Sequence, residues 1–197
     1  MNNEKFVLAT GNIGKVAEMS EILAGYGIQA VGRVKMGLNV DIEETGLTFI
    51  ENAIIKAQSI CDLTSLASIG DDSGLVVDAL GDQPGIYSSS YGGDELSDLE
   101  RCMYLLANME HITQREAKFV CAVACAFPNG DLITVTGECI GIIVKEPRGE
   151  NGFGYDPVFM PSGMDKTIGE LSPIEKNAIS HRGKALKQLA DALIDRN

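Results

Sequence analysis

Hydrophobic residues recur along the chain with the two spacings that distinguish strands from helices. The apolar run at 5–9 predicts a short buried strand that leads into the turn TGNIGK (10–15). Apolar residues at helical spacing over 16–23, ended by Gly25, predict a helix after that turn. A second strand is expected at 28–31. The chain therefore opens with a strand, a helix and a strand, the order typical of an α/β protein.

A second helix is predicted after an acidic loop. Thr48 and Glu51 form a capping-box pattern at its start, and apolar residues recur on one of its faces: Ile50, Ala53, Ile54, Ala57 and Cys61. A strand is then expected at 67–70, ending in the polar turn DDSG (71–74), with LVVDAL (75–80) as the next strand. These elements place two adjacent aspartates between two apolar strands.

The middle of the chain predicts a helix followed by a β-hairpin. A loop rich in glycine and serine precedes a helix whose capping box is Ser97 and Glu100. The expected apolar face of this helix consists of Leu99, Met103 and Leu106. Long strands are expected at 117–127 and 131–145, around the turn PNGD.

The C-terminal segment predicts a helix with an interruption. Ser172, Pro173 and Glu175 supply the N-cap, the first-turn proline and the capping-box acid, and Gly183 is the expected interruption. Strands and helices alternate early in the chain, whereas a hairpin lies in its middle. The expected fold is therefore a single α/β domain over residues 1–197, with a mixed β-sheet flanked by helices.

Composition and charge narrow the classes of function. The formal net charge of −12 argues against a nucleic-acid polymer as partner, because neutralising its phosphates needs a basic surface. A free nucleotide remains compatible with this charge, provided that some of the few lysines gather at one site. The longest apolar run, 119–127, is far short of a membrane span. Since the N-terminus also lacks a basic signal region, we expect a cytoplasmic protein with no membrane partner.

The cysteine and histidine content limits the kind of metal site. Five cysteines, with no C-x-x-C pair, are interpreted as reduced and mostly buried small residues. Cys121 and Cys125 are expected on one face of a strand. With only two histidines, a zinc site is poorly supplied. A metal bound here is expected to be a hard cation held by carboxylates.

Two polar segments follow predicted strands and are candidates for phosphate chemistry. TGNIGK (10–15) offers backbone N–H groups at a helix N-terminus beside a lysine, although it matches neither a Walker A nor a dinucleotide motif. Asp71 and Asp72 repel each other unless a cation lies near them, and Glu43 and Glu44 offer further oxygen ligands. The alternatives are an ordinary strand–helix turn and a solvated acidic turn.

Two later segments are candidates for binding a base. Phe153 lies in the glycine-rich loop GFGYDP and could stack on a base or plug the edge of a core. Lys176 and Ser180 share a helix face, followed by His181 and Arg182, and the alternative here is a solvated helix surface.

Taken together, five ordered blocks resemble the inosine triphosphate pyrophosphatase family. They are LATGNIGKV (8–16), EETGLTFIENAIIKA (43–57), DDSGLVVDALGDQPGIYS (71–88), GFGYDPVF (152–159) and EKNAISHRGKAL (175–186). The resemblance implies an elongated mixed α/β fold with two lobes, an active-site cleft between them, and a homodimer. It also implies Mg²⁺-dependent hydrolysis of ITP, dITP and XTP between the α and β phosphates, giving the monophosphate and pyrophosphate. Such an enzyme keeps these nucleotides out of DNA and RNA.

The resemblance further implies the roles of individual residues. The triphosphate is expected to contact the turn and one further lysine: Thr10, Gly11, Asn12, Ile13, Gly14, Lys15 and Lys56. Glu44 and Asp72 are expected to hold Mg²⁺. Asp72 is also the expected general base, supported in catalysis by Asp71 and Lys15, with Ser73 touching the substrate. Phe153 is expected to stack on the purine, in a pocket completed by Gly154, Tyr155, Asp156, Lys176, His181 and Arg182.

One position departs from the family pattern, and three other functions remain open from the residues alone. After PGIYS the family commonly has Ala-Arg-Tyr, whereas this chain has Ser89, Ser90 and Tyr91, so phosphate affinity or assembly can differ. The other functions are a nucleotide-binding regulator without turnover, a pyrophosphatase acting on modified pyrimidine nucleotides, and a purely structural domain. Retention of the acid cluster disfavours the first of these.

Overall fold

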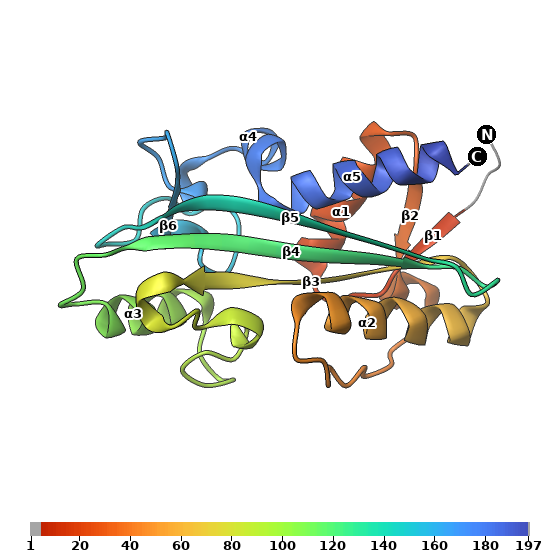
Figure 1. The fold of residues 1–197 in the computed structure, drawn as a ribbon, viewed down its shortest axis with the longest axis horizontal. Helices are drawn as coiled ribbons and strands as arrows, with labels where there is room; N and C mark the ends of the chain where they lie inside the picture. The colour runs from red at the N-terminus through yellow and green to blue at the C-terminus, as the bar shows by residue number, and fades with distance from the viewer. Residues whose placement is uncertain (1–4, 197) are drawn as a thin grey trace. The chain divides into compact units, whose positions relative to one another are not determined.

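The structure is a computed structural model that describes residues 5–196, so residues 1–4 of the N-terminal segment considered above lie outside it. The strands within this range are β1 (Lys5–Leu8), β2 (Gln29–Gly32), β3 (Ser68–Val77), β4 (Glu116–Ala126), β5 (Leu132–Ile143) and β6 (Phe159–Pro161). The α-helices are α1 (Ile13–Gly25), α2 (Phe49–Thr64), α3 (Asp98–Asn108), α4 (Pro173–Ile179) and α5 (His181–Asp195), as Figure 1 shows. Short 3-10 helices are η1 (Arg33–Met36), η2 (Asp78–Leu80), η3 (Gly85–Tyr87), η4 (Asp156–Val158) and η5 (Ile168–Glu170).

The six strands form one mixed sheet in the order β2-β1-β3-β4-β5-β6. β1 pairs in parallel with β2 and with β3, and β5 pairs antiparallel with β6. The parallel pairs follow from the α-helical crossovers α1 and α2, because parallel neighbours need a connection of this length. The expected mixed α/β fold is therefore confirmed.

The chain divides into two compact units. Among the described residues, the first unit contains 5–72, 121–137 and 181–196, and the second contains 73–120 and 138–180. Each unit has its own hydrophobic core, and β3, β4 and β5 supply residues to both. The expected position of the active site in a cleft between two lobes stays a prediction.

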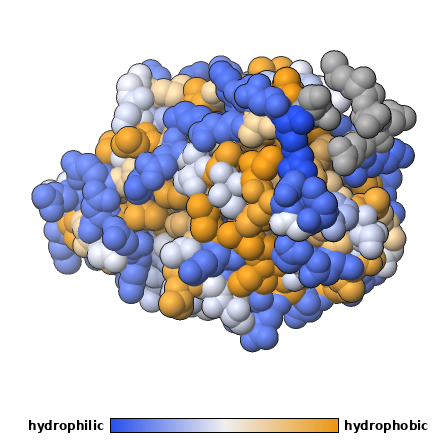
Figure 2. Space-filling view, turned by 45° about the vertical axis from the view of Figure 1, so that its right-hand side comes forward, coloured by the Kyte–Doolittle hydropathy of each residue, from blue (hydrophilic) through white to orange (hydrophobic). Residues whose placement is uncertain are grey.

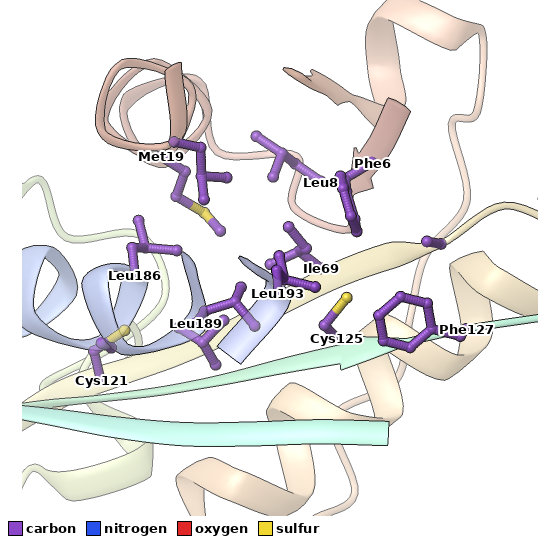
Figure 3. Packing of buried hydrophobic residues seen from close by; sticks show 14 residues of the cluster. Phe6, Leu8, Met19, Ile69, Cys121, Cys125, Phe127, Leu186, Leu189 and Leu193 are labelled. Atoms are coloured by element: carbon purple, nitrogen blue, oxygen red, sulfur yellow. The ribbon is translucent and has the colours of Figure 1, made fainter. Parts of the chain in front are cut away.

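The core of the first unit lies on both faces of β4. Cys121, Val123 and Cys125 pack in the cluster that contains residues of α1 and α5, as Figure 3 shows for the two cysteines. The intervening residues Ala122 and Ala124 pack instead with α2. This alternation is the period of two expected for a strand that is covered on both faces. All five cysteines are buried and unbonded to one another, as predicted.

In the second unit, α3 buries a different face from the one expected. Leu99 and Met103 have exposed fractions of 59% and 52%, and Leu106 alone of the predicted face is buried. The buried stripe instead runs through Cys102, Leu105 and Leu106. The prediction was wrong because the helix carries apolar residues on two sides, and local periodicity does not say which side meets the core.

The DDSG segment is part of a strand, which corrects the predicted turn between two strands. β3 runs without interruption over Ser68–Val77 and therefore includes both aspartates. The two carboxylates tolerate this buried position because cationic side chains pair with them. Gly70 brings α2 close to this strand, because a Cβ at position 70 would lie 2.4 Å from the Ala53 carbonyl oxygen.

The C-terminal helical segment is interrupted three residues earlier than predicted. α4 ends at Ile179, and Ser180 has an extended backbone with φ −66° and ψ 157°. Gly183 lies within α5, which begins at His181. The glycine was a misleading signal, since the break follows from the conformation of Ser180 and a helix tolerates an isolated glycine at a modest cost.

The surface carries apolar side chains among polar ones. Figure 2 shows hydrophobic and hydrophilic residues intermixed on the face in view. Scattered exposed apolar residues are normal for a globular protein. Over residues 5–196, no helix combines the length and the apolar character needed to cross a membrane.

Candidate active site

The turn TGNIGK places the N-terminus of α1 at an exposed position. Asn12 is the N-cap, and its Oδ1 accepts the Lys15 backbone N–H at 3.0 Å. Thr10 Oγ1 accepts the Asn12 N–H at 3.2 Å, which fixes the preceding turn. Residues 11–14 are exposed. Backbone N–H groups at a helix N-terminus favour an anion, so this loop offers a phosphate-binding geometry.

Asp71 lies in a buried chain of ion pairs within the first unit. Its Oδ2 lies 3.0 Å from Lys15 Nζ and 3.3 Å from Arg182 Nη2, and Arg182 Nη1 lies 2.9 Å from Glu18 Oε2. Burial opposes ionisation of Asp71, but Lys15 and Arg182 outweigh it and hold the pKa of this carboxyl well below its usual range. Asp71 therefore stays ionised and orients two cations.

Asp72 has different partners from its neighbour, as expected for consecutive residues of a strand. Lys56 Nζ lies 3.1 Å from Asp72 Oδ1 and 2.8 Å from Glu44 Oε2, and Asn52 Nδ2 donates to Asp72 Oδ2 at 3.2 Å. Burial raises the pKa of Asp72 above its ordinary value, and Lys56 only partly offsets this. A carboxylate with a raised pKa is a better proton acceptor than an unperturbed one.

The carboxylates beside Lys56 are of the kind that hold a hard cation such as Mg²⁺. Glu44 and Asp72 both lie within hydrogen-bonding distance of the Lys56 ammonium nitrogen, so the two carboxylates are near one another. Within residues 5–196, no group of three or more His, Cys, Asp or Glu side chains is arranged to hold a metal. Mg²⁺ commonly binds through one or two carboxylates, with waters and substrate phosphates completing its ligands. The donor set is therefore suited to Mg²⁺ in the presence of a polyphosphate.

The net charge of this cluster also favours a bound metal cation. Three cations, Lys15, Lys56 and Arg182, lie among the carboxylates of Glu18, Glu44, Asp71 and Asp72. Lys15 and Lys56 thus lie at one site, which is the condition for a protein of this net charge to bind a free nucleotide. Because the carboxylates outnumber the cations, a triphosphate would meet net negative charge unless a further cation accompanied it.

The second unit contains the aromatic loop. Asp156 Oδ2 accepts the Phe153 N–H at 2.9 Å and the Lys176 ammonium at 2.7 Å. Lys176 Nζ also lies 4.3 Å from the centroid of the Phe153 ring, a cation–π geometry. The Tyr155 hydroxyl donates to the Ser88 carbonyl at 2.8 Å. These contacts tie down the loop around a half-buried aromatic ring that has a cation over one of its faces.

Gly152 is required by the same loop. Its φ is +80°, and a Cβ at this position would lie 2.0 Å from Asp156 Oδ2. A side chain here would therefore displace the carboxylate that holds Phe153 and Lys176.

Comparison with known proteins identifies the family. The model of the Ham1 family matches residues 6–192. The chain belongs to the Ham1 family. The resemblance inferred from the five sequence blocks is thus confirmed, since the match extends over nearly the whole chain.

Relatives and solved structures of the Ham1 family agree with this assignment. The chain is 46% identical to the dITP/XTP pyrophosphatase of Escherichia coli strain K12, over 96% of this chain and 98% of that protein. It is 47% identical to the dITP/XTP pyrophosphatase of Bacillus licheniformis, over 98% of each chain. A structure of a HAM1 protein from Coxiella burnetii has a TM-score of 0.88 at 43% identity and covers 98% of this chain and 99% of that one.

In this Ham1-family chain, the predicted site residues separate into two groups. Lys15, Lys56, Asp71 and Asp72 lie together in the first unit, where Arg182 also pairs with Asp71. The second group surrounds Phe153 in the second unit and consists of Gly154, Tyr155, Asp156 and Lys176. Ser73 is half-buried in β3, and His181 is buried at the start of α5.

Lys176, His181 and Arg182 were expected to recognise the base together. The structure instead divides this segment between the two groups of site residues. Lys176 pairs with Asp156, whereas the Arg182 guanidinium pairs with Asp71 and Glu18. The recognition of a base by His181 and Arg182 stays a prediction. Ser90, where the family commonly has arginine, has its hydroxyl 3.4 Å from the Tyr87 carbonyl oxygen.

Three residues of the site were missed from the sequence. Asn52 lies four residues before Lys56 on α2, outside the predicted apolar stripe, and the only available signal was that it shares a helix face with Lys56. Besides donating to Asp72, it accepts the Gly46 N–H at 2.8 Å through Oδ1. Glu18 carried no signal beyond its helical spacing. Asp98, whose carboxylate accepts the Gly154 N–H, has the sequence position of an ordinary first-turn acid of α3.

Proposed function

We propose that this Ham1-family protein hydrolyses deaminated purine nucleoside triphosphates (ITP, dITP and XTP) to the monophosphate and pyrophosphate. Relatives named dITP/XTP pyrophosphatase match nearly its whole length. The observation that carries the proposal is the pair Asp71 and Asp72, one bound to Lys15 and the other to Lys56, beside Glu44. In the cell this activity removes such nucleotides before they enter DNA or RNA.

Binding of the triphosphate is assigned to the first unit. The N–H groups at the start of α1, where residues 11–14 are exposed, donate hydrogen bonds to phosphate oxygens, and Lys15 adds a positive charge beside them. Lys56 supplies a second ammonium next to Asp72. Hydrolysis of a polyanion requires this neutralisation, together with positioning of the attacking water.

Asp72 is assigned to the attacking water. Its carboxylate accepts a proton from that water while the oxygen attacks phosphorus and the bond to the pyrophosphate leaving group breaks. The raised pKa of Asp72 supports this role, and Asp71, held ionised by Lys15 and Arg182, orients the neighbouring cations. Ser73, the next residue of β3, is assigned to contact with the substrate.

Glu44 and Asp72 would hold Mg²⁺. When bound, the metal neutralises phosphate oxygens and makes phosphorus more electrophilic. The excess of carboxylates over cations in this cluster supports the need for it.

Glu44→Gln is expected to raise the Mg²⁺ concentration needed for half-maximal ITP hydrolysis by at least about tenfold, because loss of a carboxylate that only supports a metal ligand already weakens metal sites by this order. The measurement is a Mg²⁺ titration of the initial rate. Glu43→Gln is the matched control, since Glu43 is an exposed acid of the same loop. An unchanged titration for Glu44→Gln, or an equal shift for both variants, would remove Glu44 from the metal site.

Recognition of the base is assigned to the loop of the second unit. Phe153 stacks on the purine, and Lys176 already covers one face of the ring, so the base takes the other face. Hypoxanthine and xanthine carry a 6-keto acceptor where adenine carries an amino donor. A hydrogen-bond donor of the protein that faces the 6-position of the purine would be left unpaired when ATP binds. Sites built in this way discriminate strongly between the two kinds of substrate.

Phe153→Ala is expected to weaken binding of ITP by about 1–3 kcal/mol, the contribution of stacking one base on an aromatic ring. The rise in KM measures this loss. Phe153→Leu keeps an apolar side chain without the aromatic face and is expected to recover only part of the affinity. A KM and kcat equal to those of the unmodified protein would place Phe153 outside the pocket.

A homodimer in the cytoplasm is proposed on the family resemblance alone. Light scattering of the purified protein measures the mass directly. A mass equal to the 21.0 kDa of one chain at micromolar concentration would contradict the dimer.

The substrate range is tested by comparing kcat/KM for ITP, XTP, GTP, ATP and dUTP in the presence of Mg²⁺. We expect ITP and XTP to be preferred over ATP by several orders of magnitude, because adenine leaves a donor at the 6-position unpaired. GTP has the same 6-keto group, so a preference over GTP must come from the 2-position of the purine. Comparable turnover of dUTP would favour the broad pyrophosphatase instead. Binding of ITP without turnover would favour the nucleotide-binding regulator.

A further inference from the structure

Two side chains of α3 contact the peptide groups of one residue in the aromatic loop. The Asp98 carboxylate accepts the Gly154 N–H through Oδ2 at 2.6 Å, and Cys102 Sγ lies 3.3 Å from the Gly154 carbonyl oxygen. Positions 98 and 102 share a helix face because they are four residues apart. Burial raises the pKa of the Cys102 thiol to about 12, so it remains a donor. Helix α3 therefore holds Gly154 at both its N–H and its carbonyl group.

These contacts fix the backbone on both sides of Phe153. The peptide group before Phe153 is held where Asp156 Oδ2 accepts the Phe153 N–H at 2.9 Å. The peptide group after Phe153 contains the Gly154 N–H, which Asp98 accepts. Because each peptide group is planar, fixing the two that flank a Cα fixes its φ and ψ, and hence the direction of its Cβ. Asp98 thus holds one of the two planes that set where the Phe153 ring points.

The loop needs such an anchor because its glycines leave the backbone free. Gly152 and Gly154 have φ of +80° and +60°, in the left-handed region that glycine enters easily. The N-terminus of α3 is already capped by the capping box of Ser97 and Glu100. The contact of Asp98 with Gly154 is therefore additional to what the helix itself requires.

We propose that Asp98 is a positioning residue for base recognition, whose carboxylate holds the Gly154 peptide so that Phe153 presents a fixed ring face to the purine. This inference rests on the proposed function and deepens it by adding a residue outside the five sequence blocks. Asp98 does not touch the substrate but acts through the loop. Its loss affects ligands that carry the base and leaves ligands that carry only phosphate unaffected.

The test compares Asp98→Ala and Asp98→Asn with Asp94→Ala, a control at an exposed acid in the loop before α3. Asp98→Ala is expected to raise KM for ITP and the inhibition constant of IMP about tenfold, the effect of losing one hydrogen bond to a charged group. The inhibition constant of pyrophosphate should not change. Asp98→Asn should recover most of the affinity, because its amide oxygen accepts the same N–H. Asp94→Ala should change none of these constants.

A second measurement does not depend on turnover. The chain has no tryptophan, so Phe153→Trp introduces a single reporter into the loop. Adding Asp98→Ala to this background is expected to lower the fluorescence anisotropy of the indole, and adding Asp98→Asn should restore it. If Asp98 had a merely structural role, Asp98→Ala would lower the melting temperature without making the indole at position 153 more mobile.

Three results would overturn the inference: unchanged IMP and ITP constants for Asp98→Ala, an equal rise for pyrophosphate and IMP, or an indole anisotropy that Asp98→Ala does not alter. Failure of the proposed function is distinguishable from all three, because it appears in the unmodified protein as the absence of ITP turnover. The anisotropy of the Asp98 variants would then still decide whether Asp98 fixes the loop.

Discussion

Asp72→Asn is expected to lower kcat for ITP by about 10²–10⁴-fold, the usual contribution of a positioned general base. The substitution keeps the shape of the side chain, and an amide oxygen can still accept a hydrogen bond from Lys56 or Asn52, which contact the carboxylate now. It removes the negative charge that accepts a proton or binds a cation. Steady-state kinetics with ITP measures the loss, and circular dichroism with thermal unfolding checks that the fold is kept.

The same variant separates the two roles assigned to Asp72. If the carboxylate acts chiefly as a metal ligand, raising the Mg²⁺ concentration should restore much of the turnover. If it acts chiefly as the base, saturating Mg²⁺ should leave kcat low. If the kcat of Asp72→Asn were within about twofold of that of the unmodified protein at the same Mg²⁺ concentration, both roles would be refuted. Either role requires the negative charge of the Asp72 carboxylate.

Arg182→Met is expected to lower the free energy of unfolding by about 3–5 kcal/mol, the cost of removing one partner from a buried ionic group. The Arg182 side chain is 1% exposed and pairs with Glu18 and Asp71, which are also buried. Methionine fills similar space but leaves Glu18 without this cation and Asp71 with fewer counter-charges. Urea unfolding followed by circular dichroism measures the change.

Arg196→Met provides the control for that measurement. Arg196 pairs with Asp131 near the C-terminus, and its side chain is 34% exposed. Exposed ion pairs contribute little, so the expected loss is below about 1 kcal/mol. If Arg182→Met cost no more than Arg196→Met, the buried ion pairs of Arg182 with Glu18 and Asp71 would contribute no more than an exposed pair.

The elements with strong local signals could be predicted from the sequence. The capping boxes at Thr48, Ser97 and Ser172 all form and begin α2, α3 and α4. Such boxes involve residues only three positions apart, so no distant part of the chain has to be known. The hairpin turn between β4 and β5 belongs to the same class, because its signal lies within a few residues.

Features that depend on distant residues could not be predicted. Whether Asp71 and Asp72 form a turn or continue a strand depends on the cations that pair with them, and Arg182 lies 111 positions from Asp71. The contact of Asp98 with Gly154 joins residues 56 positions apart. The family resemblance supplied the candidate residues, but the sorting of the two aspartates between Lys15 and Lys56 required the three-dimensional structure.

The most direct test of the central claim is to identify the bond that is cleaved. Purified protein is incubated with Mg²⁺ and ITP, and the phosphorus-containing products are separated and quantified. We expect IMP and pyrophosphate in equal amounts, with no build-up of IDP, because the site is assigned to cleavage between the α and β phosphates. Release of orthophosphate with IDP, or no turnover of ITP at all, would contradict it.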